Sequence, residues 1–113
     1  MTSWTTPWKV RLNPIAEKDL KDRLKRGLIS SDDVAVLKAW VSTIEEKGPD
    51  FIATTAAGHW NDHPLFGDRR GQRSSSFSEA GRIIYKFDTS KNVIEVLRVT
   101  EEHNYSTDGD KKK

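Results

Sequence analysis

The chain has 113 residues, of which 35% are hydrophobic and 32% are charged, and its formal net charge at pH 7 is +2. This length fits one domain with a small core, and no apolar run reaches the roughly 20 residues of a membrane-spanning helix. The absence of cysteine excludes disulfides, thiolate catalysis, iron–sulfur clusters and the common cysteine-ligated zinc sites. We expect a cytoplasmic protein with a flexible segment over 1–7, a single domain over 8–105, and a disordered polar and basic tail over 106–113.

The first half of the chain predicts one strand followed by two helices. Apolar and basic residues alternate over 8–12, which is typical of a half-buried strand. Asn13, which precedes a proline, can cap a helix that ends at Gly27. Ser30 can cap a second helix, in which apolar residues recur at spacings of three and four until Gly48. Each predicted helix therefore has a residue that starts it and a glycine that stops it.

The second half of the chain predicts an irregular connection followed by three strands. Residues 49–70 show no regular pattern, and connections of this kind often carry function. From Gly71 the pattern becomes two-fold and indicates a β-hairpin, whose first strand ends at Phe77 and whose second strand begins at Arg82. Residues 93–99 are rich in β-branched side chains on both faces, as in an interior strand.

These elements predict an α+β fold in the order strand, helix, helix and three strands. Two N-terminal helices would pack on one face of a small, mainly antiparallel four-stranded sheet and leave the other face open. Residues 69–86 hold five cations and the single anion Glu79, an excess that suits a polyanion such as nucleic acid. The basic residues expected on the open face are Arg73, Arg82, Lys86 and Arg98.

The histidines before the hairpin allow two interpretations. His59 and His63 lie four residues apart with Asp62 between them, and together with His103 they could ligate a metal. We favour a site without metal, because the flanking glycine and proline disfavour a regular helix there. Trp60, beside them, either stacks on a nucleotide base or packs in the core.

One block of the sequence has a specific spacing of proline, glycine, arginine and tyrosine. It consists of Pro64-Leu65-Phe66-Gly67, Gly71, Arg73-Ser74-Ser75-Ser76-Phe77 and Gly81-Arg82-Ile83-Ile84-Tyr85. The block resembles, without a gap, one stretch of the RelE/YoeB-type bacterial toxins. Residues 8–24 resemble the first strand and helix of these toxins, and His103-Asn104-Tyr105 resembles their terminal His–Tyr signature. The chain is thus similar to the RelE/ParE superfamily over most of 8–105, with the YoeB/Txe-type messenger-RNA interferases as the nearest group.

This resemblance implies a RelE-like fold and the toxin of a type II toxin–antitoxin system. Such toxins are endoribonucleases that need no metal or other cofactor and cleave messenger RNA in the ribosomal A site of the 30S subunit. The implied partners are a cognate antitoxin and messenger RNA, with no membrane, and a homodimer stays open.

Metal-free RNA cleavage needs a base for the 2′-hydroxyl proton, cations for the phosphorane and an acid for the leaving 5′-oxygen. By resemblance, Arg82 matches the arginine that stabilises the phosphate, and His103 and Tyr105 match the terminal positions for proton exchange and orientation. The base could be His63 or Asp62, because the closest relatives carry a glutamate at position 63. The expected catalytic residues are Arg82, His63, His103 and Tyr105. The expected RNA contacts are Arg70, Arg73, Lys86, Arg98 and Trp60.

Two departures from the family keep other functions open. His63 replaces the glutamate, and Ser75 and Ser76 replace basic residues on the first hairpin strand. A non-catalytic ParE-like toxin, which inhibits DNA gyrase by binding, would tolerate both losses. A degenerate toxin that is retained for antitoxin binding would tolerate them as well.

Overall fold

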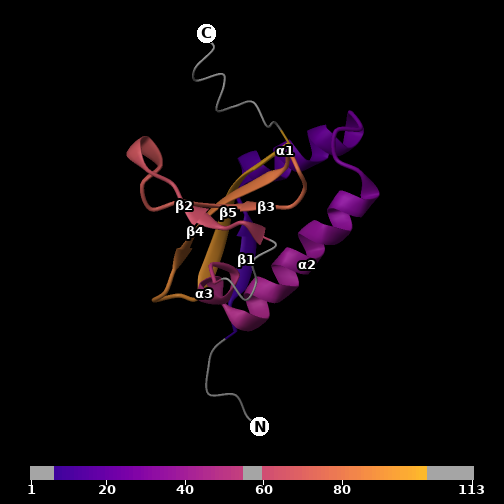
Figure 1. Ribbon diagram of the computed structural model, residues 1–113. Helices are drawn as coiled ribbons and strands as arrows, with labels where there is room; N and C mark the ends of the chain where they lie inside the picture. The colour runs from indigo at the N-terminus through magenta and orange to yellow at the C-terminus, as the bar shows by residue number, and fades with distance from the viewer. Residues whose placement is uncertain (1–6, 55–59, 102–113) are drawn as a thin grey trace.

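The computed structural model describes residues 7–54 and 60–101. Their strands form one five-stranded sheet in the order β1-β5-β4-β3-β2 (Figure 1). The strands are β1 (Lys9–Leu12), β2 (His63–Pro64), β3 (Arg73–Ser76), β4 (Arg82–Asp88) and β5 (Val93–Thr100). β1 pairs parallel to β5, and the other neighbouring strands pair antiparallel.

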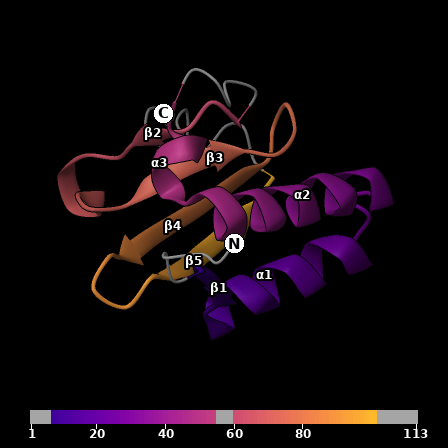
Figure 2. The ribbon, with the colours of Figure 1, turned by 90° about the horizontal axis from the view of Figure 1, so that it is seen from below.

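Two longer helices follow β1 and lie against the sheet. They are α1 (Pro14–Lys25) and α2 (Ser31–Lys47), and a single turn, α3 (Pro49–Ile52), follows them. The Asn13 side chain caps α1 by accepting from the Ala16 amide at 2.8 Å, while Ser30 and Asp33 form a reciprocal capping box on α2. Figure 2 shows α1 and α2 covering the same side of the sheet.

The structure confirms the predicted α+β class and corrects the predicted sheet. A sheet of four strands is wrong, because β2 adds a fifth strand next to β3. This strand has only two residues, His63 and Pro64, which are too few to produce an alternating pattern. The segments expected to be flexible or disordered, 1–7 and 106–113, lie outside the described residues apart from Pro7.

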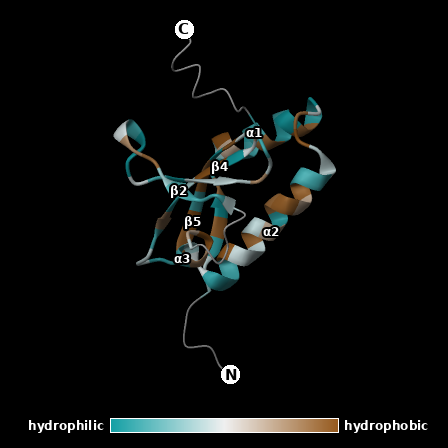
Figure 3. Ribbon diagram, in the orientation of Figure 1, coloured by the Kyte–Doolittle hydropathy of each residue, from teal (hydrophilic) through white to brown (hydrophobic). Residues whose placement is uncertain are grey.

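The core lies between α2 and the central strands. Trp40 of α2 and Tyr85 of β4 are fully buried, and their rings meet edge to face at 5.1 Å. Ile83, Ile94, Val96 and Val99 belong to the sheet side of the same core. Figure 3 shows the same division, with hydrophobic residues on β4, β5 and the middle of α2.

A buried carboxylate ties α1 to the end of β5. Asp19 is 6% exposed and accepts from Arg98 Nε at 2.7 Å and from the Val99 amide at 3.1 Å. Burial opposes its charge, but these donors, with the charges of Arg98 and Arg23, lower the pKa of Asp19 below its usual value. Within the described ranges, no helix is long and apolar enough to cross a bilayer.

Candidate functional site

β2 places two candidate bases on opposite faces of the sheet. His63 pairs with Ser74 of β3, and because side chains alternate along a strand, the neighbouring Asp62 points to the other face. Asp62 lies on the side of the helices, where its carboxylate meets Tyr85 and is fully buried. His63 lies on the opposite side and is exposed.

The imidazole of His63 has one nitrogen engaged by the backbone. Nδ1 lies 3.0 Å from the carbonyl oxygen of Asn61. Since a carbonyl oxygen only accepts, Nδ1 carries the proton in this contact, and the neutral ring keeps its lone pair on Nε2. Asn61 holds its carbonyl in place with a left-handed backbone, at φ 49°. His63 Nε2 is thereby ready to accept a proton.

Arg82 shares the face of His63. It pairs with Ser76 on β3, so two strand-to-strand spacings and two residues along the strand separate it from His63, a distance of about 12 Å between Cα atoms at ordinary strand geometry. Its Nη1 donates to the turn carbonyls of Gly81 at 2.9 Å and Glu79 at 3.2 Å. Among the described residues, Nε and Nη2 of Arg82 make no hydrogen bond, so the other edge of the guanidinium can still bind a ligand.

Arg73 lies on the helix side of the sheet, contrary to the prediction for the open face. It pairs with Tyr85, whose ring packs against Trp40 of α2. Its Nε donates to Asp62 Oδ1 at 2.6 Å, and one quarter of its side chain is exposed. The register of the hairpin decides this face, because directly opposite residues point to the same side.

Asp62 is the centre of a buried polar cluster, which we call the Asp62 cluster. Its Oδ2 accepts from Ser75 Oγ at 2.6 Å and from the Tyr85 hydroxyl at 2.5 Å, while Ser75 accepts from Trp40 Nε1 at 3.0 Å. With Arg73 on Oδ1, the carboxylate meets three donors. Asp62 is therefore committed to the fold, and His63 is the candidate base that faces solvent.

Charge and burial act together in this cluster. Burial opposes the charge of Arg73, but the Asp62 carboxylate outweighs it and raises the pKa of the guanidinium. Burial raises the pKa of Tyr85, and its hydrogen bond to Asp62 raises that pKa further. Tyr85 is therefore a neutral donor throughout the physiological pH range.

The other expected RNA contacts separate into available and committed groups. Lys86 is exposed beside Glu95 at 3.8 Å, and Arg70 is exposed on the loop after β2. Arg98 is paired with Asp19 of α1. Trp60 is 3% exposed and belongs to the core, so its ring has no free face for a base.

Three expected residues cannot be placed. His59, His103 and Tyr105 lie outside the described residues. The structure explains why a serine rather than a basic residue stands at position 75. Ser75 lies on the helix side of β3, where a basic side chain would have to be buried. Sequence reasoning missed this role of Ser75, since only the pairing of β3 with β4 reveals it.

Comparisons with known proteins bear on the fold. No family model and no curated protein sequence matches the chain. A chain of the DinJ–YafQ toxin–antitoxin complex from E. coli matches with a TM-score of 0.63 at 21% identity, covering 85% of this chain and 93% of its own length. The YoeB/ParE toxin from Agrobacterium tumefaciens matches with a TM-score of 0.64 at 19% identity, covering 83% and 98%. The chain has the RelE/YoeB-type toxin fold.

A third solved structure agrees with this toxin fold. A chain of the YoeB–YefM complex from Staphylococcus aureus matches with a TM-score of 0.59 at 14% identity, covering 84% of this chain and 97% of its own. The resemblance that rested on residues 64–85 is therefore matched by a backbone path that covers 83% to 85% of the chain in these three comparisons. Identities at this level establish the fold, and the activity has to be argued from the site.

Proposed function

We propose that this protein is the toxin of a type II toxin–antitoxin system and cleaves messenger RNA on the ribosome. The observation that carries the proposal is that His63 and Arg82 share one face of the sheet. Within residues 7–54 and 60–101, His63 Nε2 and the Nε and Nη2 groups of Arg82 make no hydrogen bond. The exposed Lys86 lies on the same face, 3.8 Å from its cross-strand neighbour Glu95. The toxin fold, found in chains of toxin–antitoxin complexes, supports the same function.

The proposed reaction is a transesterification within the RNA strand. His63 Nε2 takes the proton of a 2′-hydroxyl, whose oxygen then attacks the adjacent phosphorus. The bond from phosphorus to the 5′-oxygen breaks, and the products are a 2′,3′-cyclic phosphate and a 5′-hydroxyl. By resemblance, His103 supplies the proton of the leaving oxygen and Tyr105 orients the strand.

Arg82 would stabilise the phosphorane through the edge that the turn leaves free. Nε and Nη2 of a guanidinium can donate in parallel to two phosphoryl oxygens, and the charge persists at every relevant pH. Nη1, bound to the carbonyls of Glu79 and Gly81, fixes the plane of the group before RNA arrives. A fixed donor pair of this kind stabilises charge that develops in the transition state.

Mapping messenger ends after incubation with translating ribosomes tests the proposal. We expect new 5′-hydroxyl ends within the coding sequence, and loss of about 10²- to 10⁴-fold in rate for His63→Ala. Arg82→Ala should also abolish cleavage, whereas Arg26→Ala, which removes an exposed arginine directly after α1, should not. An intact messenger at stoichiometric protein would count against ribonuclease activity.

A gyrase-binding toxin remains the second candidate function. The observation in its favour is that Arg73 and Arg98, both expected to bind RNA, are paired with Asp62 and Asp19 instead. Supercoiling by purified gyrase separates the two functions, since only a binding inhibitor should block it without ribosomes. A protein that blocks supercoiling and leaves messenger RNA intact would establish this alternative.

A further inference from the structure

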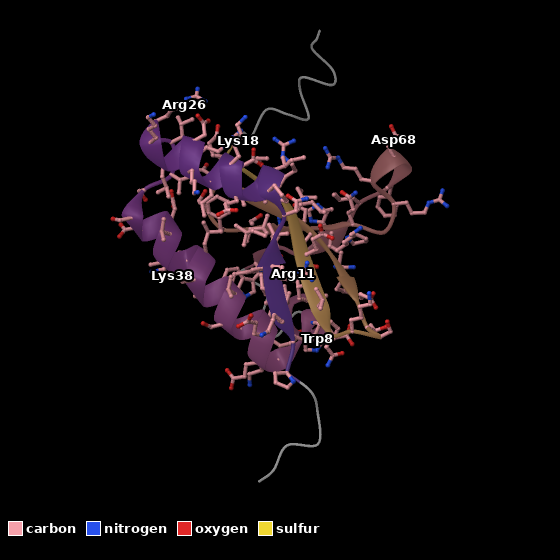
Figure 4. The ribbon with its side chains drawn as sticks, turned by 180° about the vertical axis from the view of Figure 1, so that it is seen from behind. Trp8, Arg11, Lys18, Arg26, Lys38 and Asp68 are labelled. Carbon is pink, nitrogen blue, oxygen red and sulfur yellow. The ribbon has the colours of Figure 1, made fainter. Side chains whose placement is uncertain are left out.

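The loop after β2, residues 65–72, presents an aromatic side chain to solvent. Phe66 is 78% exposed, more than any other large hydrophobic side chain among the described residues. Figure 4 shows Asp68 at the tip of this loop, which projects from the sheet away from α1 and α2. We call this segment the Phe66 loop. An exposed aromatic ring on a projecting loop offers an apolar face that a ligand can cover, and its burial would be favourable.

Backbone hydrogen bonds hold the Phe66 loop in one shape. The Leu65 amide donates to Gln72 across its base at 2.9 Å, and the Arg69 amide donates to the carbonyl of Phe66 at 3.2 Å. Gly67 and Gly71 have φ of 67° and 93°, a conformation that side-chain-bearing residues rarely adopt. The exposed ring is thus carried on an ordered turn, which lowers the entropic cost of binding a ligand.

The charges around Phe66 favour a nucleic acid over an apolar protein surface. Arg69 and Arg70 are both exposed on the loop, where Asp68 is the one acidic residue. At the base of the loop lies a cavity of about 230 Å³, whose lining includes the exposed Lys86. An exposed aromatic ring on the same loop as exposed arginines can bind unpaired nucleotides, because the ring stacks on a base and the arginines pair with the phosphate backbone.

We infer that the Phe66 loop is a second RNA-binding element, in which Phe66 stacks on an unpaired base and Arg69 and Arg70 bind phosphates. The inference deepens the proposed function and rests on it for the choice of RNA. Phe66 follows the candidate base His63 by three residues, so one RNA strand can reach both. The loop would then set which nucleotide lies next to the cleaved bond.

Fluorescence anisotropy with a short single-stranded 2′-O-methyl RNA tests binding without cleavage. Phe66→Ala should weaken binding by about 10- to 100-fold, as expected for loss of one stacked base. Phe66→Trp should retain the affinity, whereas Phe66→Leu, which keeps an apolar side chain without a ring, should bind as weakly as Phe66→Ala. Ile15→Ala, which removes an exposed apolar side chain on α1, should change nothing.

A series of RNAs, each with one abasic nucleotide at a different position, identifies stacking directly. At one position the missing base should weaken binding by the wild-type protein and have no effect on binding by Phe66→Ala. Arg69→Ala and Arg70→Ala should each lower the slope of log affinity against log salt by about 0.7. Equal affinity of wild type and Phe66→Ala, whether strong or weak, overturns the inference, and so does a Phe66→Ala defect confined to binding of a protein partner.

The two proposals fail in different ways. A protein that cleaves messenger RNA and binds the 2′-O-methyl RNA equally with or without Phe66 retains the proposed function and loses this inference. A protein that cleaves nothing, but loses RNA affinity in Phe66→Ala, retains the RNA-binding loop and loses the nuclease.

Discussion

At the scale of single residues, Asp62 connects the stability of the fold with the position of the candidate base. The carboxylate of Asp62 anchors this short segment to β3 and β4. The residue before it, Asn61, supplies the backbone carbonyl that contacts the His63 ring. A buried ion pair adds little when complete, but removal of one partner leaves a charge without compensation. The main effect of losing Asp62 would therefore be that the half-buried Arg73 and the buried Tyr85 hydroxyl are left without an acceptor.

Asp62→Ala should lower the free energy of unfolding by about 3 kcal/mol, because the half-buried Arg73 and the buried Tyr85 hydroxyl lose their acceptor. Urea denaturation measures the change. Asp68→Ala, at an exposed position of the Phe66 loop, is the matched control and should stay within about 0.5 kcal/mol of wild type. Similar stabilities of the two variants would show that the Asp62 cluster contributes little.

Tyr85 makes the stability of the folded protein depend on pH in the alkaline range. Its pKa is raised in the folded state, so above the ordinary tyrosine value of about 10 the unfolded chain loses this proton while the folded chain keeps it. The unfolded state then binds fewer protons, and the stability contributed by Tyr85 is lost as pH rises further. The stability difference between wild type and Tyr85→Phe should shrink between pH 9 and pH 11 in urea denaturation. A constant difference would mean that Tyr85 titrates normally.

At the scale of elements, the sequence predicted what depends on local pattern and missed what depends on pairing. The capped helices α1 and α2 and the strand β4 follow from residues close together in the chain, and all three are present. The strand β2 exists only because β3 lies beside it. The face of Arg73 depends on the register between β3 and β4, where a slip of one residue would reverse every side chain.

The turn between β3 and β4 has no room for a side chain at Gly81. A Cβ on Gly81 would lie 2.4 Å from the ring of Phe77, whose amide donates to the Gly81 carbonyl at 3.1 Å. Gly81→Ala should therefore destabilise the protein by about 1–3 kcal/mol through overpacking. In a Phe77→Leu background, Gly81→Ala should lower the stability clearly less. Thermal unfolding of the wild type, the two single variants and the double variant measures this difference. Equal costs in both backgrounds would exclude this contact as the cause.

At the scale of the whole molecule, the two sides of the sheet offer different chemistry. The side of the sheet opposite the helices, which we call the far side, carries His63, Arg82 and Lys86. The Phe66 loop extends from the β2 edge of the sheet. The helix side holds an apolar groove of about 410 Å³ that is lined by residues of α1, α2, β1, β4 and β5. Its apolar lining residues include Leu12, Leu20, Val34, Leu37 and Val41. RNA and an apolar protein segment could thus be bound on separate sides.

This separation predicts that antitoxin binding and RNA cleavage can be removed independently. If the protein is a toxin, as proposed, the groove would bind an apolar segment of its antitoxin. Leu12→Asp places a charge on the wall of the groove and should therefore weaken antitoxin binding at least tenfold. Ile15→Asp is the matched control, because Ile15 is more exposed than Leu12 and lies outside the groove lining.

Co-purification with the protein encoded by the adjacent gene measures the binding, and messenger cleavage measures the activity. Leu12→Asp should still cleave RNA and escape neutralisation, whereas His63→Ala should bind the antitoxin and cleave nothing. Loss of both properties in Leu12→Asp, with the fold intact by circular dichroism, would mean that the antitoxin and the RNA use one surface. The charge of the far side and the apolar character of the groove argue for two surfaces, since neither would suit the other ligand.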